Sequence, residues 1–263
     1  ETRIALFRQS VDDRLDADAE EWQPARVSFG HGWVRHGAAE LFAESVALHA
    51  PLLPVVGHED GLAIARAGGV PALDELKLHH GTVWRWNRAV YDAAAGGHLR
   101  VELRALPSGP TVIDMLANAA FLVGLTLGLA PDAETLVRRM TFGHARRNFY
   151  RAARHGLAAE MLWPFDDPPS PRTVPVRELI PRLFPVARRG LLATGVEADE
   201  ADGLLAIVAE RVRCGVTGAR WQRRTMAARE VVEPRADALR TMLARYLAAS
   251  ATDRPVHEWP LVP

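Results

Sequence analysis

The sequence has almost no cysteine and no net charge. Cys214 is the only cysteine among 263 residues, which excludes an intrachain disulfide and any zinc site built from several cysteines. Together with the lack of a signal-peptide pattern, this predicts a reducing, cytoplasmic location. The 32 basic and 32 acidic residues cancel, so no global field favours nucleic acid or an anionic membrane, and we expect neither as a partner.

Long hydrophobic runs and several widespread motifs are also absent. The longest apolar run, residues 115–130, contains Asn118 and two glycines and falls short of the ~20 residues that span a membrane, so we expect no transmembrane helix. GxxxxGK[ST], GxGxxG and GxSxG do not occur, which argues against P-loop, Rossmann and α/β-hydrolase sites. The length is sufficient to bury a core without disulfides or metals.

Helical periodicity dominates what is present. Apolar spacings of three and four predict helices at residues 38–49, 72–78, 132–140, 141–155, 177–193, 198–214, 219–230 and 235–249. A further helix at 112–129 is apolar nearly all round and should be central, with Thr111 and Asp114 capping its start. Its Gly124 and Gly128 should let another helix approach closely. In the C-terminal tail, Trp259 should act as an anchor.

The expected fold class is α+β, mainly helical with a small antiparallel sheet. We expect a sheet-bearing portion at residues 1–164 and a helical portion at 176–263 packed on it, together forming one domain. Residues 165–175 contain four prolines and are predicted to be a connecting loop.

The polar candidates concentrate on two strand-like runs, residues 82–91 and 98–106. The loop between them contains Gly96 and Gly97, which favours an antiparallel hairpin. Alternation predicts one charged face on the second strand, formed by Arg100, Glu102 and Arg104. On the first strand, Arg85 and Asn87 share a face, and Arg88 lies on the opposite one.

If the face of Arg85 and Asn87 aligns with that of Glu102, a platform of arginines, one amide and one carboxylate forms. Guanidinium groups fit phosphate or carboxylate oxygens, and Glu102 could hold a magnesium ion between them. The alternative is that Glu102 and the arginines only pair across an exposed sheet face.

Other candidates carry weaker signals. His79, His80 and His98 could suggest a metal, but no HExxH spacing or carboxylate-rich companion is present, so structural roles are favoured. Cys214 lies in a helical pattern without evident activation and is expected to be buried.

Several motifs together resemble a known family. They are HHGTVWRWNR at 79–88, HLRVELR at 98–104, LPSGPTVIDMLANAAF at 106–121, NF at 148–149, ARHG at 153–156, TGARWQ at 217–222 and PVHEWP at 255–260. This set, which covers most of the chain, is similar to the bacterial carboxylate-amine ligases related to glutamate-cysteine ligase. The chain departs from the family pattern at His80 and Leu103, where the family has Asn, and at Ala89, where it has Pro.

The resemblance implies a glutamine-synthetase-like fold, in which carboxylates on an antiparallel sheet hold Mg²⁺ around ATP. It also implies a reaction: the glutamate carboxylate attacks the γ-phosphate of ATP to form an acyl phosphate, and the amine of cysteine or a similar compound displaces phosphate. By this resemblance Glu102 is a magnesium ligand, and Arg104 and Arg85 are catalytic. The residues implied to bind the cofactor are Arg88, Asn87 and Arg100.

One part of the family pattern has no counterpart. The earlier strands with Glu-x-Glu metal ligands are missing upstream of Glu1, and a single carboxylate cannot hold two or three magnesium ions. We therefore expect this chain to be the C-terminal half of a ligase whose substrates are small molecules, namely amino acids. The N-terminal half, or a second chain covering the sheet edge, would complete it. The alternative is a non-catalytic binding or regulatory module with the same fold.

Overall fold

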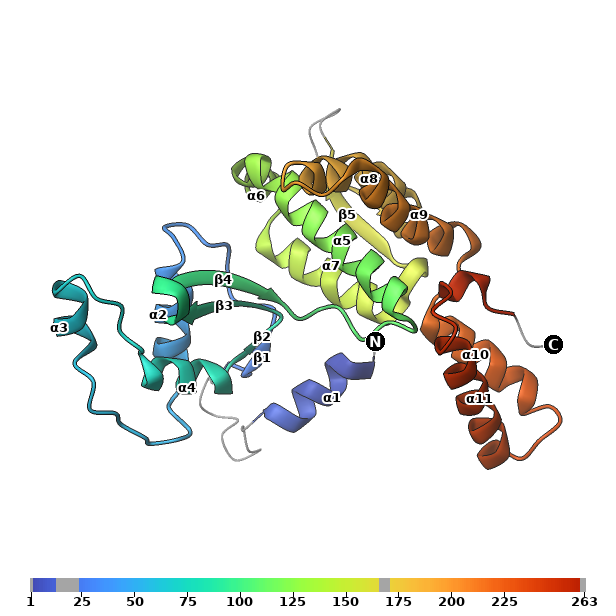
Figure 1. The fold of residues 1–263 in the computed structure, drawn as a ribbon, viewed down its shortest axis with the longest axis horizontal. Coiled ribbons are helices and arrows are strands. Elements are labelled where there is room, and N and C mark those ends of the chain that lie inside the picture. Colours follow the sequence, from blue (N-terminus) through green and yellow to red (C-terminus); the bar gives the residue numbers. More distant parts are fainter. Residues whose placement is uncertain (1, 13–23, 166–170, 261–263) are drawn as a thin grey trace. The chain divides into compact units, whose positions relative to one another are not determined.

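The computed structural model describes residues 2–12, 24–165 and 171–260, and the chain divides into two compact units (Figure 1). Unit 1 is Glu1–Ala105 and unit 2 is Leu106–Pro263. The fold class is α+β, mainly helical with small antiparallel sheets, as predicted. The proline-rich residues 165–175, expected to separate two portions, lie within unit 2.

Unit 1 combines short helices with small sheets. Strands β1 and β2 pair in parallel, whereas β3 and β4 form the predicted antiparallel hairpin. The elements of unit 1 are α1 (Thr2–Val11), β1 (Val27–Ser28), α2 (Ala39–Leu48), α3 (Gly61–Arg66), α4 (Asp74–Thr82), β2 (Trp84–Arg85), β3 (Asn87–Asp92), a 3-10 turn (Ala94–Gly96) and β4 (His98–Leu103).

Trp86 joins the two sheets of unit 1. Its backbone N–H donates to Ser28 O at 3.1 Å, and its carbonyl accepts from the backbone N–H of Arg104 at 2.9 Å. The Trp86 side chain is buried together with Val27 and Val83. The charged hairpin therefore begins directly after a residue of the hydrophobic core of this unit.

Helix α1, which was not predicted from the sequence, contacts Trp84 and the end of β4. Phe7 stacks on Trp84 with ring centres 4.3 Å apart. Arg3 donates from Nη2 to the carbonyl oxygens of Arg104 and Ala105 at 2.8 and 2.9 Å. These contacts fix α1 to the end of β4.

Unit 2 is dominated by helices. Its elements are α5 (Val112–Leu129), a 3-10 turn (Ala130–Asp132), α6 (Ala133–Arg139), α7 (Phe142–His155), a 3-10 turn (Gly156–Ala158), β5 (Glu160–Pro164), β6 (Pro171–Pro175), α8 (Val176–Leu192), α9 (Ala198–Cys214), α10 (Gly218–Arg229), α11 (Arg235–Ser250) and a 3-10 turn (Val256–Glu258). Strand β6 lies where a loop was predicted, and it pairs antiparallel with β5. Part of the predicted loop, residues 166–170, lies outside the described residues.

Helices α5 and α8 lie in close contact, and α9 packs against both (Figure 1). A Cβ at Gly124 or Gly128 would clash with the backbone oxygens of Ala187 and Val186 in α8. Reciprocally, a Cβ at Gly190 would clash with the backbone of α5. The prediction that Gly124 and Gly128 admit a neighbouring helix is confirmed, and that helix is α8.

The expectation that α5 is surrounded by core is wrong for one face. Val112, Leu116 and Val123 are 57%, 52% and 44% exposed. Among the described residues, the stretch Val112–Arg139 is apolar and long enough to cross a membrane by length and composition alone. A helix of a protein core passes the same criterion, and α5 contributes Ala117 and Phe121 to the clusters that it forms with α8 and α9.

The C-terminal tail is anchored by aromatic packing. Trp259 is buried, and its ring lies edge-on to Trp221 and Tyr246 at 5.2 and 5.3 Å. Val216 and Val256 complete this cluster. The predicted anchoring role of Trp259 is confirmed.

Candidate functional site

The register of the hairpin decides which polar side chains share a face. Arg88 lies opposite Glu102, and Val90 lies opposite Arg100. Directly opposed residues of an antiparallel pair point to the same side, so Arg88, Arg100 and Glu102 occupy one face of the hairpin. The charged face predicted from the alternation in β4 is present.

Two arginines hold the carboxylate of Glu102. Arg88 donates from Nε and Nη2 to Oε2 at 3.0 and 2.6 Å, and Arg104 donates from Nε to Oε1 at 3.0 Å. Partial burial opposes ionisation, but these hydrogen bonds from Arg104 and Arg88 outweigh it and hold the pKa of Glu102 below its ordinary value. Glu102 is therefore an ionised acceptor whose two oxygens are both bound by guanidinium groups.

Arg104 is oriented from two sides. Its guanidinium lies 4.1 Å from the ring centre of Trp84, a cation–π arrangement, while its Nε bonds to Glu102. Its Nη1 is buried and has no hydrogen-bond partner among the described residues. A donor of this kind is suited to an anion that reaches the same face.

Arg85 and Asn87 are not part of this face, which corrects the predicted platform. Asn87 lies opposite Leu103, is exposed, and points to the other side of the hairpin. Arg85 is buried in a separate cluster, where it donates to Glu44 Oε1 and Ser28 Oγ, both at 2.5 Å. Burial lowers the pKa of Arg85 below its ordinary value, and the opposing effect of the Glu44 charge is smaller.

For Arg85, the reason for this difference is a change of partner at Trp86. Trp84 and Arg85 pair in parallel with β1, whereas the residues from Asn87 onward pair with β4. For Asn87, the reason is the register of the hairpin, which places this residue opposite Leu103. Alternation alone does not determine which face of β3 lies beside Glu102.

A cavity of about 230 Å³ adjoins the charged face. Its polar lining comes from Lys77, His80, Arg88, Asp92 and Arg100. The volume lies below the ~300–1,000 Å³ of ordinary ligand pockets, so it suits one polar group of a larger ligand.

Each cationic side chain that lines this cavity has an acidic partner. Arg100 donates to Asp92 at 3.0 Å, and the pKa of His80 is lowered to about 4, mainly by burial, so His80 is neutral at pH 7. Arg88 is shared with Glu102, and Lys77 with Asp74.

The donors present do not by themselves fit magnesium. Among residues 2–12, 24–165 and 171–260, no group of three or more His, Cys, Asp or Glu side chains could hold a metal ion. Glu102 would have to exchange at least one guanidinium contact to bind a cation. A magnesium ion at Glu102 therefore requires further ligands from outside the described residues.

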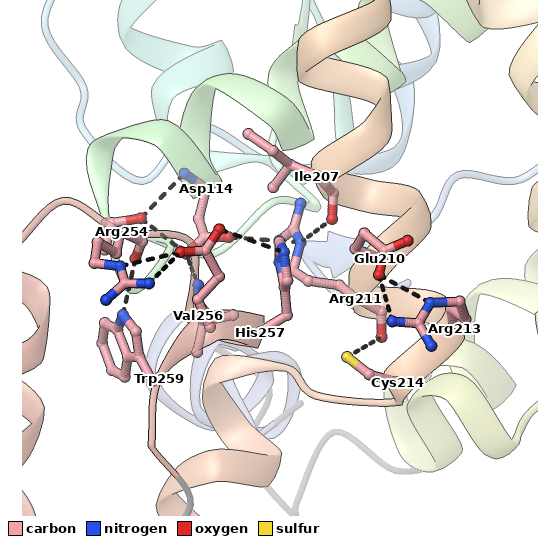
Figure 2. A network of polar contacts seen from close by, with 12 residues as sticks. Asp114, Ile207, Glu210, Arg211, Arg213, Cys214, Arg254, Val256, His257 and Trp259 are labelled. Carbon is pink, nitrogen blue, oxygen red and sulfur yellow. Dashed lines mark hydrogen bonds and ion pairs between the residues drawn. The ribbon is translucent and has the colours of Figure 1, made fainter.

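Unit 2 contains a buried polar network that sequence reasoning found only in part (Figure 2). The predicted Thr111 cap is confirmed, because its Oγ1 accepts from the backbone N–H of Asp114 at 3.2 Å. The carboxylate of Asp114 is fully buried, lies 3.5 Å from Arg211 Nε, and accepts from the backbone N–H of Val256 at 2.9 Å. Arg211 also donates to Asn118 Oδ1 at 2.8 Å.

Thr111, Asp114 and Asn118 stand three and four residues apart in the sequence, which places them on one side of a helix, but this spacing does not reveal their partners. Arg211 in α9 and Val256 near the C-terminus lie far along the chain from α5, and neither carries a local signal of pairing. Cys214, expected to be buried, is exposed.

The histidine candidates His79 and His80 have structural contacts. His79 Nε2 lies 3.1 Å from Ser45 O, and the ring of His80 lies against Phe42 with centres 4.7 Å apart.

The chain matches no protein-family model, no curated protein and no solved structure at a significant level.

Proposed function

We propose that this chain is the C-terminal portion of a cytoplasmic, ATP-dependent carboxylate-amine ligase with a glutamine-synthetase-like fold. The observation that carries the proposal is the group of Arg88, Glu102 and Arg104 on one face of a hairpin whose sequence resembles the ligase motifs. The substrates proposed are glutamate and an amine such as cysteine.

The chemistry of this face suits phosphate. In a ligase of this kind ATP supplies the phosphoryl group that activates the carboxylate. Arg104 would bind and orient phosphate oxygens through its buried, unpartnered Nη1, and Arg88 and Arg100 would add positive charge beside the 230 Å³ cavity. Such fixed charges stabilise the charge that gathers on a transferring phosphoryl group.

The partner proposed is a further set of strands carrying carboxylates. Among the described residues, β3 and β4 pair only with each other, and a two-stranded hairpin leaves backbone groups open on both outer edges. The N-terminal half of the enzyme, or a second chain, would cover an edge and supply magnesium ligands.

The test is ATP–Mg²⁺ binding by calorimetry to the wild-type chain and to Arg104→Met and Arg88→Met. A charge-assisted hydrogen bond contributes roughly 1.5–3 kcal/mol, so each variant should bind ATP at least ~10-fold more weakly. Arg138→Met is the control, because Arg138 is exposed and pairs only within α6. Binding that is absent, or equal in all variants, contradicts the proposal.

A second function, a binding module without turnover, is favoured by one observation. Both oxygens of Glu102 are already held by Arg88 and Arg104, as in a structural ion-pair cluster. Glu102→Ala separates the two functions. A ligase portion should lose its magnesium-dependent gain in ATP affinity, whereas a binding module should bind its ligand equally with and without magnesium.

Phosphate release across a panel of amino acids and amines then identifies the substrates. The assay should be run on this chain alone and on the chain together with a candidate N-terminal half. Release only in the combined sample supports a site completed by the second part. Release by this chain alone contradicts the half-site and leaves the ligase assignment standing.

A further inference from the structure

A second cavity in unit 1 lies away from the charged hairpin face. It has a volume of about 470 Å³, within the ~300–1,000 Å³ typical of small-molecule sites. Its walls come from α2, α4 and residues 49–56, which follow α2. The lining is mainly aliphatic, with His49, His79, Thr82 and Glu75 as its polar members.

The aliphatic wall is unusually exposed. Val55 and Val56 are 62% and 82% exposed, and Leu52, Leu53 and Val46 are also classed as exposed. Single exposed apolar side chains are common, but five that line one hollow form a patch of the kind that marks a ligand site.

His49 supplies a buried polar group in this wall. Its side chain lines the cavity, the residue is only 5% exposed, and its Nε2 has no hydrogen-bond partner among the described residues. Buried polar atoms are nearly always satisfied, so an unpartnered one beside a cavity indicates a group that a ligand can complete. Ser45 O already occupies Nε2 of the neighbouring His79.

The protonation state of His49 sets the ligand class. Burial, reinforced by the charges of Arg85 and Arg26, lowers the pKa of His49 to about 4, so the imidazole is neutral at pH 7. A neutral imidazole can donate one hydrogen bond or accept one, but it does not neutralise an anion. Transfer of an unpaired ion into an aliphatic cavity is strongly unfavourable.

We propose that this cavity binds a small, uncharged, mainly apolar molecule with one hydrogen-bonding group. The apolar body lies against Leu52, Leu53 and Val55, and the polar group completes the hydrogen bonding of His49. This site is independent of the proposed ligase activity, because none of these residues belongs to the charged hairpin face.

The test uses cyclohexanol as the probe and the full chain as the protein. Calorimetry should give saturable binding, and histidine NMR should show a shift of the His49 side-chain resonances. His49→Phe keeps an aromatic ring and removes the hydrogen bond, so affinity should fall roughly fivefold. Val55→Trp, at an exposed position, should fill the cavity and abolish binding.

The matched control is His36→Phe, an exposed histidine of the same unit that does not line the cavity. It should bind cyclohexanol as the wild type does. Lack of saturable binding, an unshifted His49 resonance, or equal affinity in His49→Phe would overturn the proposal. Cyclohexanecarboxylate binding as tightly as cyclohexanol would overturn the assignment of an uncharged ligand. If His49→Phe does not fold, the resonance shift in the wild-type protein decides.

Discussion

At the residue scale, Asp114 contacts several separate segments of unit 2. Its carboxylate is fully buried, pairs with Arg211, and also accepts from Thr111 Oγ1 and the backbone of Val256. It therefore links the start of α5 to α9 and to the C-terminal segment in one set of contacts (Figure 2).

Replacement Asp114→Ala should be strongly destabilising. It leaves Arg211 as a buried charge without its counter-ion, a change that typically costs about 3–5 kcal/mol. Denaturant unfolding measures the loss. Asp202→Ala, which removes the exposed partner of Arg188, serves as the control and should cause a much smaller change. Equal effects of the two substitutions would show that the buried pair has no special role.

Two buried histidines predict a pH dependence of stability. The pKa values of His49 and His80 are each lowered to about 4, mainly by burial, whereas an unfolded histidine titrates near pH 6.5. Below about pH 6.5 the unfolded chain therefore binds protons that the folded chain does not. The contribution of the two histidines to the free energy of unfolding is therefore fully present above that pH and is lost as the pH falls toward 4. For each histidine, the folding equilibrium constant should fall by up to about tenfold per pH unit.

Urea unfolding between pH 7 and 5 tests this dependence. The double variant His49→Phe/His80→Phe should show a flatter profile, because neither position can take up a proton. Carboxylates that titrate near pH 4 contribute little in this range. An unchanged slope in the double variant would assign the pH dependence to other groups.

Prediction of the candidate site from sequence succeeded where one strand suffices. Alternation in β4 placed Arg100 and Glu102 together correctly. It failed for Asn87, whose side depends on the hairpin register, and for Arg85, whose position depends on the change of partner at Trp86. Neither property is local, so the spacing of residues in β3 could not supply it.

At the scale of elements, the contact of α5 with α8 depends on the absence of side chains. Gly124 and Gly128 on one helix and Gly190 on the other bring the two backbones together. Helix packing at ordinary distances, about 8–10 Å between axes, uses side chains as spacers, and here those spacers are missing.

Gly190→Ala should destabilise unit 2 although alanine favours helices. The new methyl group would clash with the backbone of α5, and overpacking of this kind typically costs about 1–3 kcal/mol. Thermal unfolding followed by circular dichroism measures the change.

Gly203→Ala is the matched control, because this glycine lies inside α9 with open space around it. It should stabilise the protein by about 0.5–1 kcal/mol. A stabilising effect at Gly190 would mean that the helices can separate without cost.

The long helices and the β3–β4 hairpin were predictable, whereas strand β6 and helix α1 were not. The predicted limits of α5 and α9 coincide with those observed, since caps and long apolar periods mark them. Strand β6 was missed, because its pairing with β5 outweighs a local composition, including Pro171 and Pro175, that favours a loop. Helix α1 was left unassigned because its short sequence has little periodicity.

At the scale of the whole molecule, the division falls between Ala105 and Leu106. The sequence carries turn signals at Pro107, Gly109 and Pro110, but residues 165–175 contain more prolines. Composition cannot reveal that β5 and β6 pair across the second segment and so keep it inside one unit.

We expect residues 106–263 to fold when produced alone. The hydrophobic clusters around Leu191, Val212 and Trp221 draw all their members from this range. Far-UV circular dichroism should show a helical spectrum, and heating should give a cooperative transition. A fragment that lacks such a transition would show that it needs residues of unit 1 to fold.

The stack of Phe7 on Trp84 and of Trp84 on Arg104 has an optical consequence. The indole of Trp84 contacts both α1 and the guanidinium that binds Glu102. Its emission should therefore respond both to detachment of α1 and to any ligand that draws Arg104 away. A difference spectrum against Trp84→Phe would isolate this signal from the other six tryptophans, so the chain carries its own fluorescent reporter of the Glu102 cluster.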